Sequence, residues 1–480
     1  MSRYDLILTS ARVLTATHDG IADIGIRDGK IAALGDLSGA ETGDRRDLTG
    51  KVVTPGGVDV HCHIEQMSGM GLMNADTFET ATRSAAIGGT TSVISFAAQA
   101  RGQRLSDAMS DYASAACRGA MIDHAFHMIV ADMSVPSVAE DMRRLIGEGH
   151  RSIKVFTTYN IQLSDREICE VIGIAREAGA LVCIHAENDG LIGWTKERLV
   201  AAGKHAPRYH AVSHPRLAEI EAVERMIRFA EFFATPLMLF HISTREALDA
   251  IRAAKARGVP VWAETCPHYL MMAADFLDRD GIEGAKWMCS PPQRATDDQV
   301  ALWEGLGDGT LSLVSSDHAP YRFDETGKLS QGRDVDFSKI ANGLPGLEVR
   351  MPLLFDEIVS KGRLPATEFA RLTATEPARL YGLSGKGDIA EGFDADLVVW
   401  GPYVQVTYGP DDLNDNVGYN PWEGRTVTGW PEMTLLRGKV VAEAGAVRAE
   451  PGTGRWIDRP AIGAATDRSP APEYTEATMP

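Results

Sequence analysis

The chain has 480 residues, of which 44% are hydrophobic and 24% charged, and its formal net charge is −18. This length allows a large core and two domains, whereas the acidic balance argues against a nucleic-acid partner, which would bind a basic surface. No apolar run approaches the roughly 18 residues of a membrane span, and the first residues lack the apolar stretch of a secretory signal. We therefore expect a soluble cytoplasmic protein whose six cysteines, scattered without CxxC spacing, are reduced thiols.

The first part of the chain, residues 1–54, has the pattern of short strands separated by Gly and Asp turns. Three segments carry it: DLILTSARVLTA, ADIGIRDGKIAALG and KVVTP. From Gly56 the pattern changes, because short apolar strands now alternate with longer segments of helical periodicity. This alternation over 55–384 is typical of repeated βα units.

Eight strands are predicted in this second part, at residues 58–63, 91–97, 124–130, 152–158, 181–187, 237–243, 259–265 and 311–317. Helices are predicted between them, for example at 76–89, 166–179, 217–233 and 244–258, and several of these end in Gly, as helix C-caps do. The pattern predicts an α/β fold in which eight parallel strands close into a TIM-like (β/α)8 barrel. The active site of such a barrel lies at the carboxyl ends of its strands.

Strand-like sequence returns at 385–450, in GDIAEGFDADLVVW and TVTGWPEMTLLRGKVVAEAG. We expect these strands to pair with those of residues 1–54, so that a small β-sandwich domain is built from both chain ends. The last segment, 451–480, is rich in Pro, Ala, Thr and Gly and is predicted to be an extended C-terminal arm.

The stretch GGVDVHCHIEQ places two histidines one residue apart at the end of the first barrel strand. Alternate side chains of a strand point the same way, so His61 and His63 would project together and form a metal clamp. A lone His-x-His motif is as often a pair of ordinary polar residues. However, His185, His241 and Asp317 lie near the ends of other predicted strands. Since these ends converge on one mouth, the sequence favours a metal site there.

Lys154, in the fourth strand, is an unusual member of this set because an ammonium group does not bind metal. If burial keeps its amine neutral, the nitrogen can add carbon dioxide and become a carbamate. A carbamate has two oxygens and can bridge two divalent ions that lie about 3.5–4 Å apart. The alternative is an ordinary salt-bridged strand lysine.

The chain resembles the dihydropyrimidinase/hydantoinase branch of the amidohydrolase superfamily. The matching segments, from about Asp5 to Arg455, are, in order, GGVDVHCHIEQ, SIKVFTTYN, VCIHAEN, FHISTREAL, AETCPHYL, CSPPQR, VSSDHAP and NGLPGLEVRMPLLF. The resemblance implies a TIM-like barrel that carries a β-sandwich, a binuclear centre that usually holds zinc, and a homotetramer or dimer with C-terminal arms crossing between subunits.

The resemblance also implies a role for each site residue. Six residues would bind metal: His61 and His63 on one ion, His185 and His241 on the other, carboxylated Lys154 (N6-carboxylysine) on both, and Asp317 on the first ion. Tyr159 would hydrogen-bond the substrate carbonyl, and the backbone of Ser290 and Asn342 would hold a cyclic amide.

The implied chemistry is hydrolysis of a C–N bond in a dihydropyrimidine or hydantoin ring, which gives an N-carbamoyl amino acid. Two cations generate a bridging hydroxide near neutral pH, the hydroxide attacks the ring carbonyl, and Asp317 shuttles the proton to the leaving nitrogen. The polar Gln66 and Ser68, in the loop after His63, argue against a bulky aromatic substituent on the ring. His205, His210 and His214 are expected to lie in a polar loop.

Other functions stay open at this point. An allantoinase or a cyclic imide hydrolase would use the same scaffold, and a dihydroorotase-like enzyme would carry an arginine where Glu65 stands. A non-catalytic scaffold relative would have lost metal ligands, whereas this chain retains all six ligand positions.

Overall fold

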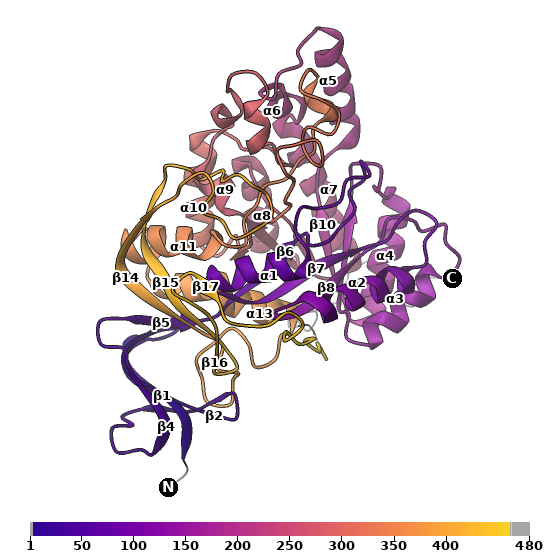
Figure 1. Ribbon diagram of the computed structural model, residues 1–480. Coiled ribbons are helices and arrows are strands. Elements are labelled where there is room, and N and C mark those ends of the chain that lie inside the picture. Colours follow the sequence, from indigo (N-terminus) through magenta and orange to yellow (C-terminus); the bar gives the residue numbers. More distant parts are fainter. Residues whose placement is uncertain (1–2, 461, 463–480) are drawn as a thin grey trace.

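All eight predicted barrel strands are present, and they form one parallel sheet in the order β13-β12-β11-β10-β9-β8-β7-β6 in a computed structural model that describes residues 3–460 and 462. The strands are β6 (Gly57–Cys62), β7 (Thr90–Ala98), β8 (Asp123–Ile129), β9 (Ser152–Phe156), β10 (Leu181–His185), β11 (Leu237–Leu239), β12 (Val261–Thr265) and β13 (Leu313–Val314). The predicted α/β barrel is therefore confirmed (Figure 1).

The barrel closes where the chain beyond β13 meets β6. Cys62 and His318 form an isolated parallel bridge. The backbone N–H of His63 donates to the His318 carbonyl at 2.7 Å, and the Ser316 hydroxyl donates to the His61 carbonyl at 3.2 Å. These bonds hold the His61 segment beside the Asp317 segment.

Several strands end earlier than predicted, and β11 and β13 are shortened most at their carboxyl ends. The sequence predicted strands over 237–243 and 311–317, but β11 ends at Leu239 and β13 ends at Val314. The reason is the backbone at His241 and Asp317, whose φ angles of 42° and 47° are left-handed and incompatible with a strand. Both residues therefore lie in turns beyond their strands.

The helices alternate with the strands as predicted. They are α1 (Phe78–Ile87), α2 (Leu105–Gly119), α3 (Val138–Gly147), α4 (Asp165–Ala178), α5 (Asp189–Ala201), α6 (Tyr209–Ser213), α7 (Arg216–Phe233), α8 (Arg245–Ala256), α9 (Pro267–Met271), α10 (Thr296–Gly307), α11 (Arg350–Leu354), α12 (Thr367–Ala370) and α13 (Glu376–Tyr381). Short 3-10 turns at Ala274–Leu277, Glu283–Trp287 and Phe337–Lys339, and π-helical turns at Phe355–Ser360 and Arg371–Thr375, complete the set.

Local sequence explains why the helices begin and end where they do. In α4, Ser164 and Glu167 form a capping box, which satisfies free N–H groups of the first turn. The helix ends at Gly179, whose left-handed φ of 77° suits a residue without Cβ.

The second sheet is mixed and joins both chain ends, as predicted. Its order is β17-β16-β15-β14-β5-β1-β2-β3, and β4 pairs with β1. The strands are β1 (Tyr4–Leu14), β2 (Asp19–Arg27), β3 (Lys30–Gly35), β4 (Thr42–Asp47), β5 (Val52–Pro55), β14 (Leu397–Thr407), β15 (Thr426–Leu436), β16 (Lys439–Glu443) and β17 (Ala446–Val447). Antiparallel pairing of β5 with β14 makes the junction. The domain limits 1–54, 55–384 and 385–450 stay predictions.

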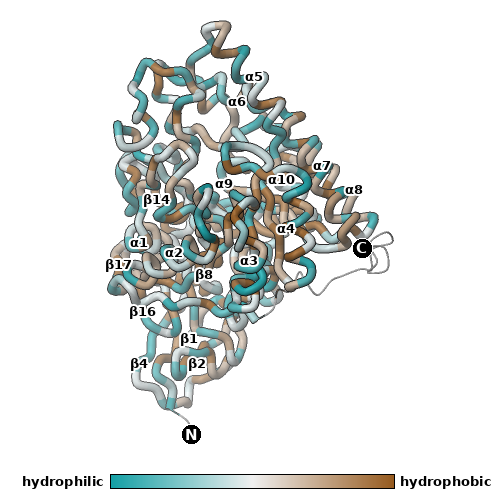
Figure 2. The backbone as a smooth tube through the Cα atoms, turned by 90° about the vertical axis from the view of Figure 1, so that its right-hand side faces the viewer, coloured by the Kyte–Doolittle hydropathy of each residue, from teal (hydrophilic) through white to brown (hydrophobic). Residues whose placement is uncertain are grey.

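The core has separate layers. Val58, Val60, Phe96 and Phe240 belong to a cluster of barrel-strand side chains that fills the barrel interior. A larger cluster packs the outer faces of the strands against the helices, and a third lies on the mixed sheet. In Figure 2 hydrophobic stretches of chain run through the body of the barrel and hydrophilic stretches lie at outer turns.

The start of the predicted C-terminal arm packs on the chain's own barrel. Trp456 bridges to His124, at the start of β8. The fully buried Arg459 donates from Nη1 to Ser152 Oγ at 2.8 Å and from Nη2 to the Phe126 carbonyl at 2.7 Å. The rest of the arm, residues 461 and 463–480, lies outside the described residues. Within the described part, no helix has the length and apolar character to cross a membrane.

Candidate metal centre

A cavity of about 600 Å³ opens at the carboxyl ends of the barrel strands. The structure brings all nine predicted site residues to its wall: His61, His63, Lys154, Tyr159, His185, His241, Ser290, Asp317 and Asn342. They come from strand ends and loops that are far apart in the sequence and meet only because the sheet closes.

His61, His63 and Asp317 form the first group of candidate ligands. Asp317 Oδ1 lies 3.1 Å from His61 Nε2 and 3.5 Å from His63 Nε2. The other ring nitrogens are held from behind, His61 Nδ1 by Glu264 and His63 Nδ1 by Gln66 Oε1 at 2.7 Å. Burial opposes ionisation of Asp317, but its two histidine partners hold the pKa of its carboxyl well below the ordinary value. Partners of this kind fix the ring orientation of metal-binding histidines.

His185 and His241 form the second group. Their ring centroids are 4.5 Å apart, and His241 lies 5.4 Å from His61, so the two groups adjoin. Glu187 Oε2 lies 2.9 Å from His185 Nε2. Among the described residues, His241 Nδ1 is buried without a hydrogen-bond partner. A buried nitrogen in this state is costly unless a ligand meets it.

Lys154 lies between the two groups on β9 and is buried. Its Nζ faces aromatic rings, 4.0 Å from the centroid of Phe240 and 4.9 Å from that of Phe156. Among the described residues no carboxylate lies within ion-pair distance of it. Burial lowers the pKa of Lys154 to about 7. The salt-bridged lysine that the sequence left open is therefore not what the structure contains.

The three predicted substrate residues face the same space. Tyr159 has a left-handed φ of 71°, and its ring centroid lies 5.3 Å from that of His185. Burial holds the pKa of the Tyr159 phenol well above its ordinary value, so the hydroxyl stays a hydrogen-bond donor. Ser290 Oγ lies 3.2 Å from His214 Nε2, and Asn342 Oδ1 is buried without a partner in the described part of the chain.

Sequence reasoning missed the residues that hold the ligands, namely Glu264, Gln66 and Glu187. Gln66 and Ser68, which the sequence assigned to the loop that shapes the substrate pocket, both line the cavity, and their effect on a ring substituent stays a prediction. Gln66 Oε1 also lies 2.7 Å from His63 Nδ1, a contact that the sequence analysis did not foresee. Its position three residues after His63 was the available signal.

The expected polar loop is also different in the structure. His210 and His214 are buried and line the cavity around the short helix α6, and only His205 is exposed. His210 Nε2 donates to the Cys289 carbonyl at 2.8 Å, directly before Ser290. The prediction failed because the flanking Gly, Lys and Arg gave this segment a polar composition.

The donor set fits divalent cations. It combines imidazole nitrogens, a carboxylate and an amine able to become a carbamate, and among the described residues the buried His241 Nδ1 lacks a protein partner. Imidazole and carboxylate are the ligands that catalytic zinc prefers. The fold and the site together therefore define a barrel hydrolase of the metal-dependent type.

The comparisons give the family. The model of the Amidohydrolase family matches residues 52–441, and the chain belongs to this family. It is 39% identical to a D-hydantoinase of Rhizobium radiobacter over 95% of this chain and 99% of that protein. The structure of a dihydropyrimidinase from Brevibacillus agri is similar with a TM-score of 0.90 and 37% identity, covering 95% of this chain and 99% of that one. An L-hydantoinase from Arthrobacter aurescens is similar with a TM-score of 0.87 and 29% identity, covering 95% and 100%.

Proposed function

We propose that this chain opens hydantoin or dihydropyrimidine rings by hydrolysing a ring amide C–N bond, which releases an N-carbamoyl amino acid. Among amidohydrolases it is a cyclic amidohydrolase, since its relatives of this type are similar over nearly their whole length. The observation that carries the proposal is the convergence of six ligand-type side chains and Tyr159 on one cavity.

Two zinc ions are the proposed cofactors. His61, His63 and Asp317 would hold one, His185 and His241 the other, and the carbamate of Lys154 both. The carbamate forms when the neutral Lys154 amine attacks the carbon of CO2 and loses a proton, and the lowered pKa supports this step. When bound, the ions lower the pKa of a water molecule and polarise the substrate carbonyl.

Asp317 is the proposed proton carrier. It accepts a proton from the water that attacks the ring carbonyl carbon, and it returns that proton to the ring nitrogen as the C–N bond breaks. Its place between two imidazoles keeps it ionised before the reaction. Tyr159 remains protonated and donates to the carbonyl oxygen as negative charge develops there.

Ser290 and Asn342 are the proposed ring-binding residues. The Ser290 hydroxyl already contacts His214, which leaves its main-chain atoms for the substrate. A hydantoin or dihydropyrimidine ring alternates C=O and N–H groups, so main-chain donors and acceptors on one side of the cavity can match it. The polar Gln66 and Ser68 also line this cavity, so we expect a ring without a bulky aromatic substituent.

We further propose a cytoplasmic homotetramer, on the basis of the family resemblance. All six cysteines are unpaired, as expected in a reducing compartment. Light scattering during size-exclusion chromatography tests the assembly, and a monomer would contradict it.

A substrate panel tests the function. Hydantoin, 5-substituted hydantoins, dihydrouracil, allantoin, dihydroorotate and cyclic imides are incubated with zinc-loaded protein, and ring opening is followed by loss of ultraviolet absorbance. We expect turnover of hydantoins or dihydrouracil with release of a carbamoyl product. Exclusive turnover of allantoin or an imide would replace the proposed substrate, and a zinc-loaded protein that opens no ring would contradict the proposal.

A further inference from the structure

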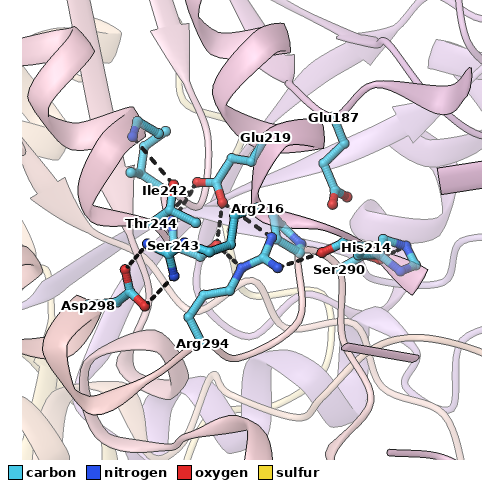
Figure 3. A network of polar contacts seen from close by, with 12 residues as sticks. Glu187, His214, Arg216, Glu219, Ile242, Ser243, Thr244, Ser290, Arg294 and Asp298 are labelled. Atoms are coloured by element: carbon cyan, nitrogen blue, oxygen red, sulfur yellow. Dashed lines mark hydrogen bonds and ion pairs between the residues drawn. The ribbon is translucent and has the colours of Figure 1, made fainter. Parts of the chain in front are cut away.

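A buried polar network connects the loop that carries His241 to the segment that carries Ser290 (Figure 3). Its centre is Arg294, whose side chain is 6% exposed. Arg294 donates from Nε to Ser243 Oγ at 3.0 Å and from Nη1 to the His214 carbonyl at 2.6 Å. The guanidinium does not line the cavity, so it acts on the site only through its partners.

Glu219, on α7, completes one side of the network. Its carboxylate accepts the backbone N–H groups of Ser243 at 2.7 Å and Thr244 at 3.3 Å, and it lies 3.4 Å from Arg294 Nη2. Ser243 follows His241 by two residues. Because the backbone of His241 has a left-handed φ angle, its loop has a costly conformation that the surrounding structure must enforce. Glu219 and Arg294 are the buried groups that hold the loop immediately after it.

His214 forms the other side of the network. Arg294 fixes its carbonyl, and its ring Nε2 lies 3.2 Å from Ser290 Oγ. Arg294 itself follows Ser290 by four residues, so it also anchors the end of that segment. The Arg294 guanidinium therefore holds the loop that follows His241, a candidate metal ligand. It also holds His214, which contacts Ser290, a candidate ring-binding residue.

We propose that Arg294 is a positioning residue that fixes His241 and Ser290 relative to each other. This inference rests on the proposed function. Three separate acceptors in different directions require the forked guanidinium, and a lysine ammonium would not reach them all. Loss of Arg294 also leaves the Glu219 carboxylate buried without its cation.

The test compares Arg294→Met and Arg294→Lys with the control Arg216→Met. Arg216 lies beside the same loop and pairs with the buried Asp298 at 2.7 Å, and its side-chain hydrogen bonds go to Asp298 and Glu246 rather than to Ser243 or His214 (Figure 3). Each protein is stripped of metal and titrated with zinc alone, and KM, kcat and the unfolding temperature are then measured with hydantoin as substrate.

We expect both Arg294 variants to bind the second equivalent of zinc at least about 10-fold more weakly than the wild type. KM should rise several-fold because Ser290 loses its fixed contact. Arg216→Met should lower the unfolding temperature while zinc binding and KM stay unchanged. If Arg294→Met does not fold, Ser243→Ala removes one acceptor of the network and should weaken zinc binding in the same direction.

Folded Arg294 variants with wild-type zinc affinity and KM would overturn the inference. An Arg216→Met variant whose zinc affinity and KM change as much as those of the Arg294 variants would also overturn it. For Ser243→Ala the same wild-type values would do so. A wild-type protein that binds no zinc, or opens no ring, would contradict the proposed function instead.

Discussion

The two ends of the barrel each gather buried charged groups, but they balance them differently. At the amino ends of the strands, Lys386 Nζ lies 2.6 Å from Asp123, 3.0 Å from Asp394 and 2.6 Å from Asp396. These carboxylates are close enough to hold a metal ion, yet an ammonium already lies among them. At the carboxyl ends, Lys154 has no carboxylate at ion-pair distance in the described chain. The lysine of the cluster at the amino ends is paired with carboxylates, as in a structural cluster. The lysine at the carboxyl ends has no such partner, as in a functional site.

Three residues at the carboxyl ends of the strands have a strained backbone. His241, Asp317 and Tyr159 all have left-handed φ angles, between 42° and 71°, and all line the cavity. Such conformations cost roughly 1–3 kcal/mol each and persist where the surrounding structure enforces them. The mouth of the barrel is therefore built at a cost to stability, which its function explains.

Replacing the single carboxylate at the mouth should have the largest effect. We expect Asp317→Asn to lower kcat roughly 10²–10⁴-fold, because the proton shuttle is lost. Bound metal, measured by mass spectrometry, should persist, since the amide oxygen can still serve as a ligand. Normal turnover in this variant would remove Asp317 as the proton carrier.

Removing Lys386 from its cluster with Asp123, Asp394 and Asp396 should lower stability and leave catalysis unchanged. Lys386→Met removes the cation shared by the buried Asp123 and Asp396 and the half-buried Asp394, and we expect a loss of about 3–5 kcal/mol in the free energy of unfolding, measured with urea. Zinc content and KM of the folded protein should not change. A change in KM would show that the two ends of the barrel are coupled.

The pH dependence of this cluster has a defined sign. In the wild type, burial opposes ionisation of Asp123, but Lys386 and Arg437 lower its pKa, so its contribution to stability is present above the ordinary carboxyl pKa and is lost on acidification. Without Lys386 the pKa values of these carboxyls rise. The loss in the free energy of unfolding that Lys386→Met causes should therefore be smaller at pH 5 than at pH 8. A loss that grows on acidification would contradict the account.

Replacing the residue that orients His61, while keeping His61 itself, should have a smaller effect on zinc binding and activity. Glu264 holds His61 Nδ1 and also accepts the Ser315 hydroxyl at 2.6 Å. Glu264→Gln should weaken zinc binding or activity by about 10–100-fold, in the range of other partners of metal-binding histidines. Zinc titration of the metal-free variant measures this, and wild-type affinity would show that His61 needs no such support.

An exposed ion pair supplies the smallest expected effect. Arg166, whose side chain is 89% exposed, pairs with Glu170 one turn along α4. Arg166→Ala should change the free energy of unfolding by at most about 0.5 kcal/mol and leave zinc binding unchanged. A loss comparable to that of Lys386→Met would mean that burial does not decide the strength of these pairs.

Much of the fold and site could be predicted from local sequence. His61 and His63 could be recognised because their spacing matches the period of a strand, and alternating βα segments implied that distant strand ends converge. The partners of these ligands could not be predicted, because Glu264 and Arg294 meet their targets only through tertiary packing. Nor could the turns at His241 and Asp317 be predicted, since nothing in their local sequence requires a left-handed backbone.

The most direct test concerns the amine of Lys154. Metal-free protein is reloaded with zinc in ¹³C-labelled bicarbonate, zinc per subunit is counted by mass spectrometry, and labelled carbon is detected by NMR. We predict two zinc ions and one labelled carbamate carbon per subunit in the wild type, and no such carbon in Lys154→Met. A wild-type protein that binds two zinc ions and opens its substrate ring while Lys154 carries no labelled carbon would contradict the account.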